Sequence, residues 1–272
     1  MSRASATAKL NLALIVGPRR ADGKHELTTV YQRVAIADRV EVGRAPRLRV
    51  EGFAADTLVR DALVQLARAA GVEPCWRARI WKRVPVAAGL GGGSSDAATA
   101  LVLANRTLAA PLPPSRLHEL AQALGADVAF FLERGPQLGS GDGSELAPLD
   151  LPQDYFVVVA VARDVAKTST ADVYLRFDTR RGADGYDARR AALLAALAEV
   201  RRPRDLATLP PNDLAASPLA DELRALGAFR ADVTGAGPAV YGLFQHRATA
   251  DAARRALRSS ARLWVTVPAW YG

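Results

Sequence analysis

The stretch that decides the fold runs from residue 82 to residue 98 and reads KRVPVAAGLGGGSSDAA. Four glycines fall within the five residues 89–93, after a strand-like segment and before a run of helix formers. Because glycine tolerates positive φ angles and has no Cβ, several backbone N–H groups of such a loop can converge on one anion. The sequence predicts a helix capped at Ser94, and its free N–H groups and dipole would add to that attraction. We therefore expect this loop to bind phosphate.

The loop differs from the two commonest phosphate-binding loops. A Walker A motif ends in Gly-Lys followed by Ser or Thr, whereas Gly93 is followed by Ser94 and Ser95. The dinucleotide pattern G-x-G-x-x-G fails because Ser94 occupies its last glycine position. A plain turn would explain a lone G-x-G, but four glycines, two capping hydroxyls and a preceding basic strand exceed what a turn needs. The loop has no lysine of its own, so other segments must supply positive charge.

The patterns around the loop predict a mixed α and β protein. In the first half, alternating apolar residues at 9–16, the turn Asp22-Gly23 and a second strand at 27–34 predict a β-hairpin. Further strands are expected at 39–42, 47–53 and 75–84, and helices at 57–70, 97–108 and 113–124. The first half should therefore be a sheet with helices.

The second half begins after a short linker near 149–154. An almost continuous apolar run at 155–162 is typical of a buried strand, so we predict the domain boundary at residue 150. The remaining elements are expected to be helices at 188–200, 218–226 and 248–259 and strands at 239–244 and 263–267. The arginine-rich stretch 180–190 is interpreted as an exposed, mobile loop.

Composition narrows the class of protein. The 272 residues are 50% hydrophobic and can bury a sizeable core, yet no apolar run approaches the roughly 18 residues that span a bilayer. We expect a cytoplasmic protein without a membrane partner. The net charge of +8 lies on dispersed arginines, which favours attraction of polyanionic small molecules over nucleic-acid binding. The single cysteine, Cys75, excludes an internal disulfide and a multi-cysteine metal site.

A family resemblance rests on four segments. Residues 85–98 closely resemble the second motif of the GHMP kinases, the superfamily of galactokinase, homoserine kinase and mevalonate kinase. Residues 8–12 with 20–27, then 124–131, then 233–240 resemble one branch, the 4-diphosphocytidyl-2-C-methyl-D-erythritol kinases of non-mevalonate isoprenoid biosynthesis. The matches fall in order from Lys9 to Phe244, so the resemblance covers nearly the whole chain.

The resemblance implies an α+β, two-domain GHMP kinase fold. Residues 1–150 would form an N-terminal nucleotide-binding domain like that of ribosomal protein S5, and residues 151–272 a C-terminal ferredoxin-like domain, with the active site between them. The implied reaction is ATP-dependent phosphorylation of the 2-hydroxyl of a substrate that carries a cytidine diphosphate group. The implied ATP-binding residues are Lys82, Pro85, Val86, Ala87, Ala88, Gly89, Leu90, Gly91, Gly92, Gly93, Ser94, Ser95, Thr234, Gly235 and Gly237.

The resemblance also implies a catalytic pair. Asp127 would take or orient the proton of the acceptor hydroxyl, and Lys9 beside it would stabilise the ionised carboxylate. From the sequence alone, Asp127 could instead be a helix N-cap and Lys9 a solvated residue at a strand edge. Lys9 is, however, one of only four lysines in a chain whose usual cation is arginine.

Substrate contacts are implied at three positions. Asn11 lies within the first segment that carries the resemblance, His25 should contact the edge of the cytosine, and Tyr174 should stack on one of its faces. Lys24 departs from the pattern, because the family usually carries an aromatic residue there, and stacking on that side would be lost or replaced by cation–π or phosphate contacts. Asp56 stands where the resemblance suggests an asparagine near the nucleotide, and a helix N-cap explains it equally well.

Magnesium is the expected cofactor beside ATP, because the triphosphate must be neutralised. No carboxylates at ligand spacing are visible, so we expect phosphate oxygens, waters and Ser94 or Ser95 to hold the metal, with no metal site made by the protein alone. Two alternatives stay open: another GHMP kinase acting on homoserine or mevalonate, and a non-catalytic nucleotide-binding relative. The sequence does not predict an oligomeric state.

Overall fold

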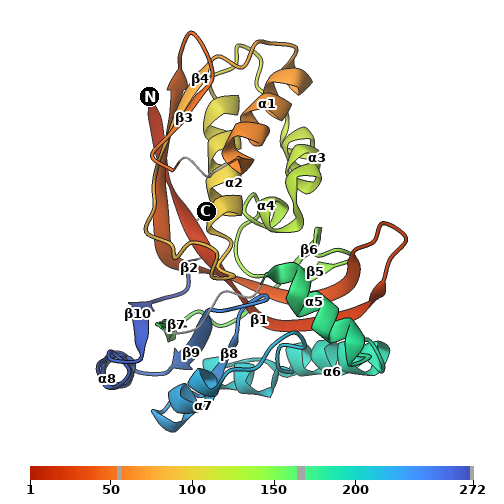
Figure 1. Ribbon diagram of the computed structural model, residues 1–272, viewed down its shortest axis with the longest axis vertical. Coiled ribbons are helices and arrows are strands. Elements are labelled where there is room, and N and C mark those ends of the chain that lie inside the picture. The colour runs from red at the N-terminus through yellow and green to blue at the C-terminus, as the bar shows by residue number, and fades with distance from the viewer. Residues whose placement is uncertain (54–56, 164–168, 270–272) are drawn as a thin grey trace.

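The first sheet is built on a long β-hairpin. A computed structural model describes residues 1–53, 57–163 and 169–269. Strands β1 (Ser2–Arg19) and β2 (His25–Arg44) pair antiparallel around the predicted turn and run through much of the molecule (Figure 1). The sheet has the order β3-β4-β2-β5-β6, with β1 paired to β2. Its shorter strands are β3 (Arg49–Glu51), β4 (Trp76–Trp81), β5 (Gln137–Ser140) and β6 (Glu145–Pro148).

Four helices pack beside this sheet and form a core with it. They are α1 (Leu58–Ala70), α2 (Gly92–Asn105), α3 (Pro114–Leu124) and α4 (Ala126–Phe130). Helix α2 lies between the sheet and α1 and is buried over most of its length, which suits its run of small and apolar residues. Gly71 ends α1 in the left-handed conformation, as predicted. The start of α2 therefore has a fixed position against the sheet.

The second sheet has ferredoxin-like topology. Its order β10-β7-β9-β8 places the fourth strand beside the first and the third beside the second, and all pairs are antiparallel. Helices α7 and α8 cover one face (Figure 1). The strands are β7 (Phe156–Ala162), β8 (Arg230–Val233), β9 (Val240–Phe244) and β10 (Ala261–Thr266), and the helices are α5 (Thr170–Thr179), α6 (Tyr186–Glu199), α7 (Pro218–Ala225) and α8 (Arg247–Ala256), with a 3-10 helix at Pro203–Thr208.

One apolar core joins the two sheets. Leu10, Leu12 and Ile15 of β1 are fully buried in the same cluster as Val157 of β7 and Tyr241 of β9. The Tyr241 hydroxyl donates to the Leu12 carbonyl at 2.9 Å. The long hairpin therefore belongs to both halves of the molecule, and it carries the first predicted site residues to the second sheet.

The structure corrects several expected boundaries. Helix α2 begins at Gly92 after an N-cap at Gly91 with φ 68°, so the prediction of capping by Ser94 to Asp96 is wrong. The predicted strands 27–34 and 39–42 are parts of one strand, β2. Helix α6 begins at Tyr186, so only the first part of 180–190 lies in turns. Among the described residues, no helix is long and apolar enough to cross a membrane.

Candidate active site

The glycine loop lies against the second half of the molecule. Gly89 has φ 84°, and a Cβ at this position would stand 2.5 Å from the Thr234 carbonyl oxygen. The Ala239 N–H donates to the Ala88 carbonyl at 3.0 Å. Both the left-handed backbone and the close approach require glycine at position 89. The loop is therefore held between the start of α2 and the segment 234–239.

A second glycine turn faces the loop from the C-terminal half. Gly235 and Gly237 both have positive φ, at 59° and 77°. The Asn212 side-chain amide donates to the Gly235 carbonyl at 2.8 Å and to the Val233 carbonyl at 3.0 Å. Thr234 is fully buried, and its Oγ1 accepts the Asn11 N–H at 3.0 Å. These bonds tie the turn to β1 and fix its position opposite the glycine loop.

Two cavities meet at the loop. One, of about 330 Å³, is lined by Phe53, Thr57, Leu58, Lys82 and every residue from Pro85 to Ser94. The other, of about 270 Å³, is lined among others by Lys9, Asn11, Tyr31, Asp127 and Tyr174. Both include Ala87, Gly89 and Gly91 in their walls. We call them the loop cavity and the pair cavity; a phosphoryl group bound at the shared residues would face both.

The pair cavity holds the predicted catalytic residues in contact. Lys9 Nζ lies 3.3 Å from Asp127 Oδ2 and donates to Asn11 Oδ1 at 2.7 Å. The Asn11 amide in turn donates to Thr29 Oγ1 at 2.8 Å. Lys9 is buried, whereas the Asp127 side chain is 32% exposed and opens to the cavity. This geometry leaves the carboxylate accessible to a small molecule while the lysine stays fixed behind it.

Two tyrosines complete the pair cavity, and only one of them is among the predicted site residues. Burial, with the nearby Asp127 carboxylate as a second cause, raises the pKa of Tyr174 to about 12 and that of Tyr31 well above its ordinary value. Lys9 Nζ lies 5.7 Å from the centre of the Tyr31 ring. Tyr31 is the cross-strand partner of Asn11, so it reaches the cavity through the register of the hairpin.

Lys82 lies at the loop cavity but is already paired. Its Nζ donates to Asp38 Oδ2 at 2.5 Å and to Asp96 Oδ2 at 2.7 Å, and both carboxylates are fully buried. Burial alone would lower the pKa of Lys82, but these two hydrogen bonds raise it above its ordinary value. Lys82 therefore anchors the strand before the loop to the start of α2. Asp38 and Asp96 were missing from the predicted site.

The two serines after the loop have different surroundings. Ser94 is half-buried and lines the loop cavity, whereas Ser95 is buried and does not appear in the wall of either cavity. Helix α2 starts at Gly92, before the expected start at residue 97, and Ser95 lies inside the helix with its side chain buried in the core. The two hydroxyls are therefore not equivalent at this site. Among the described residues, no group of three or more His, Cys, Asp or Glu side chains could hold a metal ion.

His25 and Tyr174 lie together beside the pair cavity. Their rings stack with centres 4.8 Å apart and an interplanar angle of 26°, and His25 Nε2 is 2.7 Å from Asp178 Oδ1. Lys24 does not contact these rings; its ammonium group pairs with Asp142 in the β5–β6 turn. Asp56 lies outside the part of the chain that the structure describes.

The fold and the loop define the class of protein. Residues 57–135 match the family model of the GHMP kinase N-terminal domain, and residues 210–263 match that of the GHMP kinase C-terminal domain. A crystal structure of mevalonate kinase (TM-score 0.74, 11% identity, 98% of this chain and 99% of that one) shares the fold. The chain is thus a GHMP kinase, an enzyme class that uses ATP to phosphorylate small molecules.

Closer relatives identify the branch. The chain is 37% identical to the 4-diphosphocytidyl-2-C-methyl-D-erythritol kinase of Salinispora tropica, over 95% of this chain and 88% of that protein. It is 34% identical to that of Chlorobaculum parvum, over 96% and 95%. A crystal structure of 4-(cytidine 5'-diphospho)-2C-methyl-D-erythritol kinase superposes with a TM-score of 0.78 at 32% identity, covering both chains completely. The protein belongs to the 4-diphosphocytidyl-2-C-methyl-D-erythritol kinase family.

Proposed function

We propose that this protein transfers the γ-phosphoryl group of ATP to the 2-hydroxyl of 4-diphosphocytidyl-2-C-methyl-D-erythritol. The observation that carries the proposal is the Lys9–Asp127 pair, 3.3 Å apart, in the cavity that shares its wall with the glycine loop. The names of the relatives supply the acceptor, which the geometry alone does not specify. Donor and acceptor would occupy the loop cavity and the pair cavity.

In this mechanism the protein mainly positions the two substrates and stabilises negative charge, and it takes little direct part in the bond changes. The backbone N–H groups of Gly89 to Gly93 and the start of α2 would hold the phosphates of ATP. Asp127 would accept the proton of the substrate 2-hydroxyl while the oxygen of that hydroxyl bonds to the γ-phosphorus of ATP. The bond from the γ-phosphorus to the β–γ bridging oxygen would break at the same time, and ADP would leave. Lys9 would stabilise the Asp127 carboxylate and the negative charge that develops on the transferred group.

Magnesium would be held at this site mainly by the phosphate oxygens of ATP. Asp38 and Asp96 are occupied by Lys82, and no described cluster of carboxylates offers a cage. We propose that phosphate oxygens, waters and the Ser94 hydroxyl would hold the ion, with Ser95 excluded by its burial. When bound, magnesium neutralises negative charge on the β- and γ-phosphates. Chelation with EDTA should abolish turnover, and excess Mg²⁺ should restore it.

The cytidine group would lie along Tyr174 in the wall of the pair cavity and extend toward His25. These rings stack on each other, and His25 forms a hydrogen bond with Asp178. We propose that Tyr174 offers a stacking surface to the base and that His25 contacts its edge, with Asp178 orienting the imidazole. The Lys24–Asp142 pair would border this region instead of a second aromatic wall.

We also propose that the domains are residues 1–150 and 151–272. The last strand of the first sheet ends at Pro148 and the first strand of the second begins at Phe156, which supports a boundary between them. The long hairpin contributes to the core of both, so the domains would share an interface made by β1 and β2.

The test is an ADP-release assay with a panel of alcohols. The purified protein with ATP and Mg²⁺ should release ADP with 4-diphosphocytidyl-2-C-methyl-D-erythritol at a kcat/KM at least about a hundredfold above those for homoserine and mevalonate. Phosphorus NMR of the product should show a new phosphomonoester. ADP release with a simple alcohol and none with the cytidine substrate would refute the proposal.

A further inference from the structure

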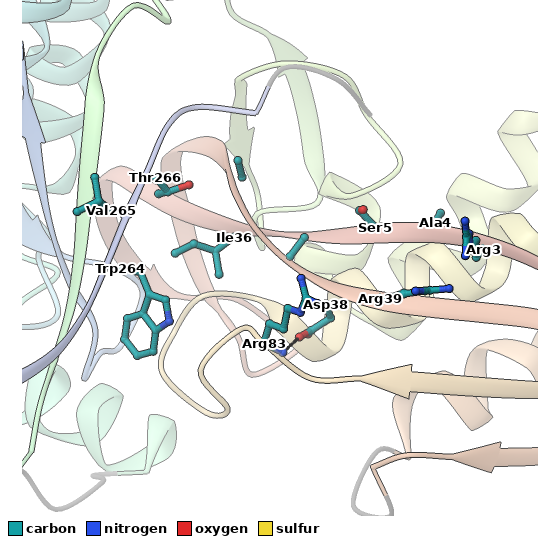
Figure 2. A pocket seen from close by; sticks show the side chains of 12 residues that line it. Arg3, Ala4, Ser5, Ile36, Asp38, Arg39, Arg83, Trp264, Val265 and Thr266 are labelled. Atoms are coloured by element: carbon teal, nitrogen blue, oxygen red, sulfur yellow. Dashed lines mark hydrogen bonds between the residues drawn. The ribbon is translucent and has the colours of Figure 1, made fainter. Parts of the chain in front are cut away.

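A cavity of about 1010 Å³ lies outside both pockets just described, between β1, β2 and β10. Figure 2 shows Arg83 beside Asp38 in the middle of this cavity, Trp264 of β10 on one side, and Arg3 and Arg39 on the other. Apart from Asp38, no described residue of its wall carries a carboxylate. The proposed ATP and acceptor residues do not line it, so the proposed reaction leaves this cavity unexplained.

Three arginines of this cavity lack a carboxylate partner. Arg3, Arg39 and Arg83 are exposed, and none forms an ion pair within 4.0 Å among the described residues. Two other arginines of the same sheet are paired: Arg77 and Arg79 contact Glu51 at 2.8 and 3.0 Å. The Arg39 guanidinium lies 5.2 Å from the Trp81 ring, a contact that leaves its in-plane N–H donors available.

The strand register directs these side chains to one place. Ser5 of β1 lies directly opposite Arg39 of β2, so Arg3, Ser5 and Arg39 stand on the same face of the sheet. Arg3 and Arg39 are diagonal neighbours, about 7–8 Å apart at the backbone. Glu41, directly opposite Arg3, is the nearest carboxylate in the register and forms no ion pair with it within 4.0 Å. Like charges held so close repel one another, and an anion between them would relieve that repulsion.

We propose that this cavity binds a small molecule with a diphosphate group, its phosphates on Arg3, Arg39 and Arg83 and its remaining part against Trp264 and Ile36. Arginine forks suit phosphate oxygens because each can donate two parallel hydrogen bonds. Trp264 is half-buried, and it offers a ring face that accepts either a planar base or an alkyl chain. A nucleotide and an alkyl diphosphate share this chemistry, so both are tested below.

One carboxylate links the cavity to the glycine loop. Asp38 Oδ2 accepts from Lys82 Nζ in the loop cavity, and Asp38 Oδ1 accepts the backbone N–H groups of Arg83 and Val84. Neighbouring residues 82 and 83 thus reach into different cavities and share one anchor. If the proposed function holds, a diphosphate on Arg83 changes the affinity for ATP, and ATP changes the affinity for the diphosphate by the same factor.

The test counts binding sites by equilibrium dialysis with inorganic pyrophosphate, ADP and n-octyl diphosphate. Under the proposed function the glycine loop binds phosphates as well, so the wild-type protein should bind two equivalents of ADP. Gly89→Ala should weaken one site and Arg39→Gln/Arg83→Gln the other, by about tenfold or more. At the second site, the affinities for ADP and for n-octyl diphosphate are each compared with the affinity for pyrophosphate. The compound that binds more tightly than pyrophosphate shows whether Trp264 prefers a planar base or an alkyl chain.

The controls separate the site from general charge and from misfolding. Arg106→Gln removes another exposed arginine, at the end of α2, and should keep two equivalents. Arg39→Lys/Arg83→Lys should keep part of the affinity. Circular dichroism and melting temperature should match the wild type. One equivalent in the wild type that Arg39→Gln/Arg83→Gln leaves unchanged, or two equivalents in that double variant at unchanged affinity, would overturn the site. One equivalent that the double variant loses would support the site and count against ADP binding at the glycine loop. Arginine-dependent binding of a twelve-nucleotide RNA with no second diphosphate site would also overturn it and assign the groove to nucleic acid.

Discussion

The Asp127 carboxylate reaches the pair cavity while its lysine partner is held from behind. Lys9 is fixed by its bond to Asn11 and by its place in β1, so its ammonium group cannot follow a moving substrate. Such a fixed charge suits a step in which negative charge develops at a defined point, because no reorganisation is needed when the reaction occurs.

Removing either member of the pair should therefore stop the reaction without unfolding the protein. Asp127→Asn and Lys9→Met should each lower kcat at least about a hundredfold, since the first removes the proton acceptor and the second its charge partner. Steady-state kinetics and the melting temperature would be measured together. Asp150→Asn, an exposed aspartate outside both cavities, is the control and should keep the wild-type rate. A kcat within threefold of wild type for both site variants would remove the pair from the mechanism.

Gly89 and Gly93 make a matched pair for testing the loop. Gly89→Ala places a methyl group 2.5 Å from the Thr234 carbonyl on a left-handed backbone, whereas a Cβ at Gly93 meets nothing within 4 Å. Gly89→Ala should raise the KM for ATP or lower kcat by about tenfold or more, because the loop must move away from the phosphates. Gly93→Ala should preserve α2 and change the kinetics by less than Gly89→Ala, because its methyl group displaces no protein atom and its backbone N–H stays in place. Equal kinetics for the two variants would contradict this account of the loop.

At the scale of single elements, α5 is attached to the hairpin by ion pairs. Asp178 near its C-terminal end bonds to His25 of β2 and to Arg19 of β1. The hydrogen bond from His25, followed by that from Arg19, lowers the pKa of Asp178 below its ordinary value. A carboxyl group with a lower pKa in the folded state adds stability above its unfolded value of about 3.9, and this stability is lost as the pH falls through the folded value.

Asp178→Asn should therefore destabilise the protein in a pH-dependent way. Urea unfolding should show a loss of about 1 kcal/mol or less at pH 6, where Asp178 is ionised in both states. The difference from wild type should shrink below about pH 4 as the carboxyl becomes protonated. Hydrogen exchange of α5 should rise at pH 6. A difference that stays constant from pH 6 to pH 3 would show that the ion pairs do not hold this helix.

The helices and strands also show which parts of the fold can be predicted from sequence patterns. The hairpin, α1 with its Gly71 stop, and the buried strand β7 follow directly from periodicity and turn residues. Helix α5 was missed, although Ser169 followed three residues later by Asp172 is a helix-start pattern, and Ser169 does accept the Asp172 N–H. The start of α2 was placed too late because Gly92 and Gly93 are poor helix formers, and packing against the sheet and α1 overrides that preference.

The site was predicted in part for a similar physical reason. Motifs within one segment, such as the glycine loop, are visible in the sequence. Tyr31 and Asp38 reach their cavities through the register of β1 with β2, and that register shifts at the irregularities after Thr7 and Asn11. No pattern in the sequence shows those shifts, so neither residue could be assigned from it.

For the molecule as a whole, the shared core predicts cooperative unfolding. The Tyr241 hydroxyl is fully buried and bonds both to the Leu12 carbonyl of β1 and to Arg230 of β8, each at 2.9 Å. Tyr241→Phe leaves the Leu12 carbonyl and the Arg230 side chain buried without this hydrogen-bond partner. It should lower the free energy of unfolding by about 1–3 kcal/mol. Protection from hydrogen exchange should fall in both sheets, and urea unfolding should remain a single transition.

Tyr155 supplies the control for that experiment. Its hydroxyl is buried and has no hydrogen-bond partner among the described residues, so Tyr155→Phe should be neutral or slightly stabilising. Separate transitions for the two sheets in the Tyr241→Phe protein would instead indicate that the hairpin does not couple them.

The common wall of the loop and pair cavities has a bearing on inhibitor design. The three residues that both cavities share, Ala87, Gly89 and Gly91, carry nothing larger than a methyl group. A bisubstrate compound that joins an adenosine phosphate to an erythritol mimic would therefore cross backbone alone, with no bulky side chain to displace at the crossing. Its two halves would bind as one tethered ligand, and the second would gain from the effective concentration set by the linker.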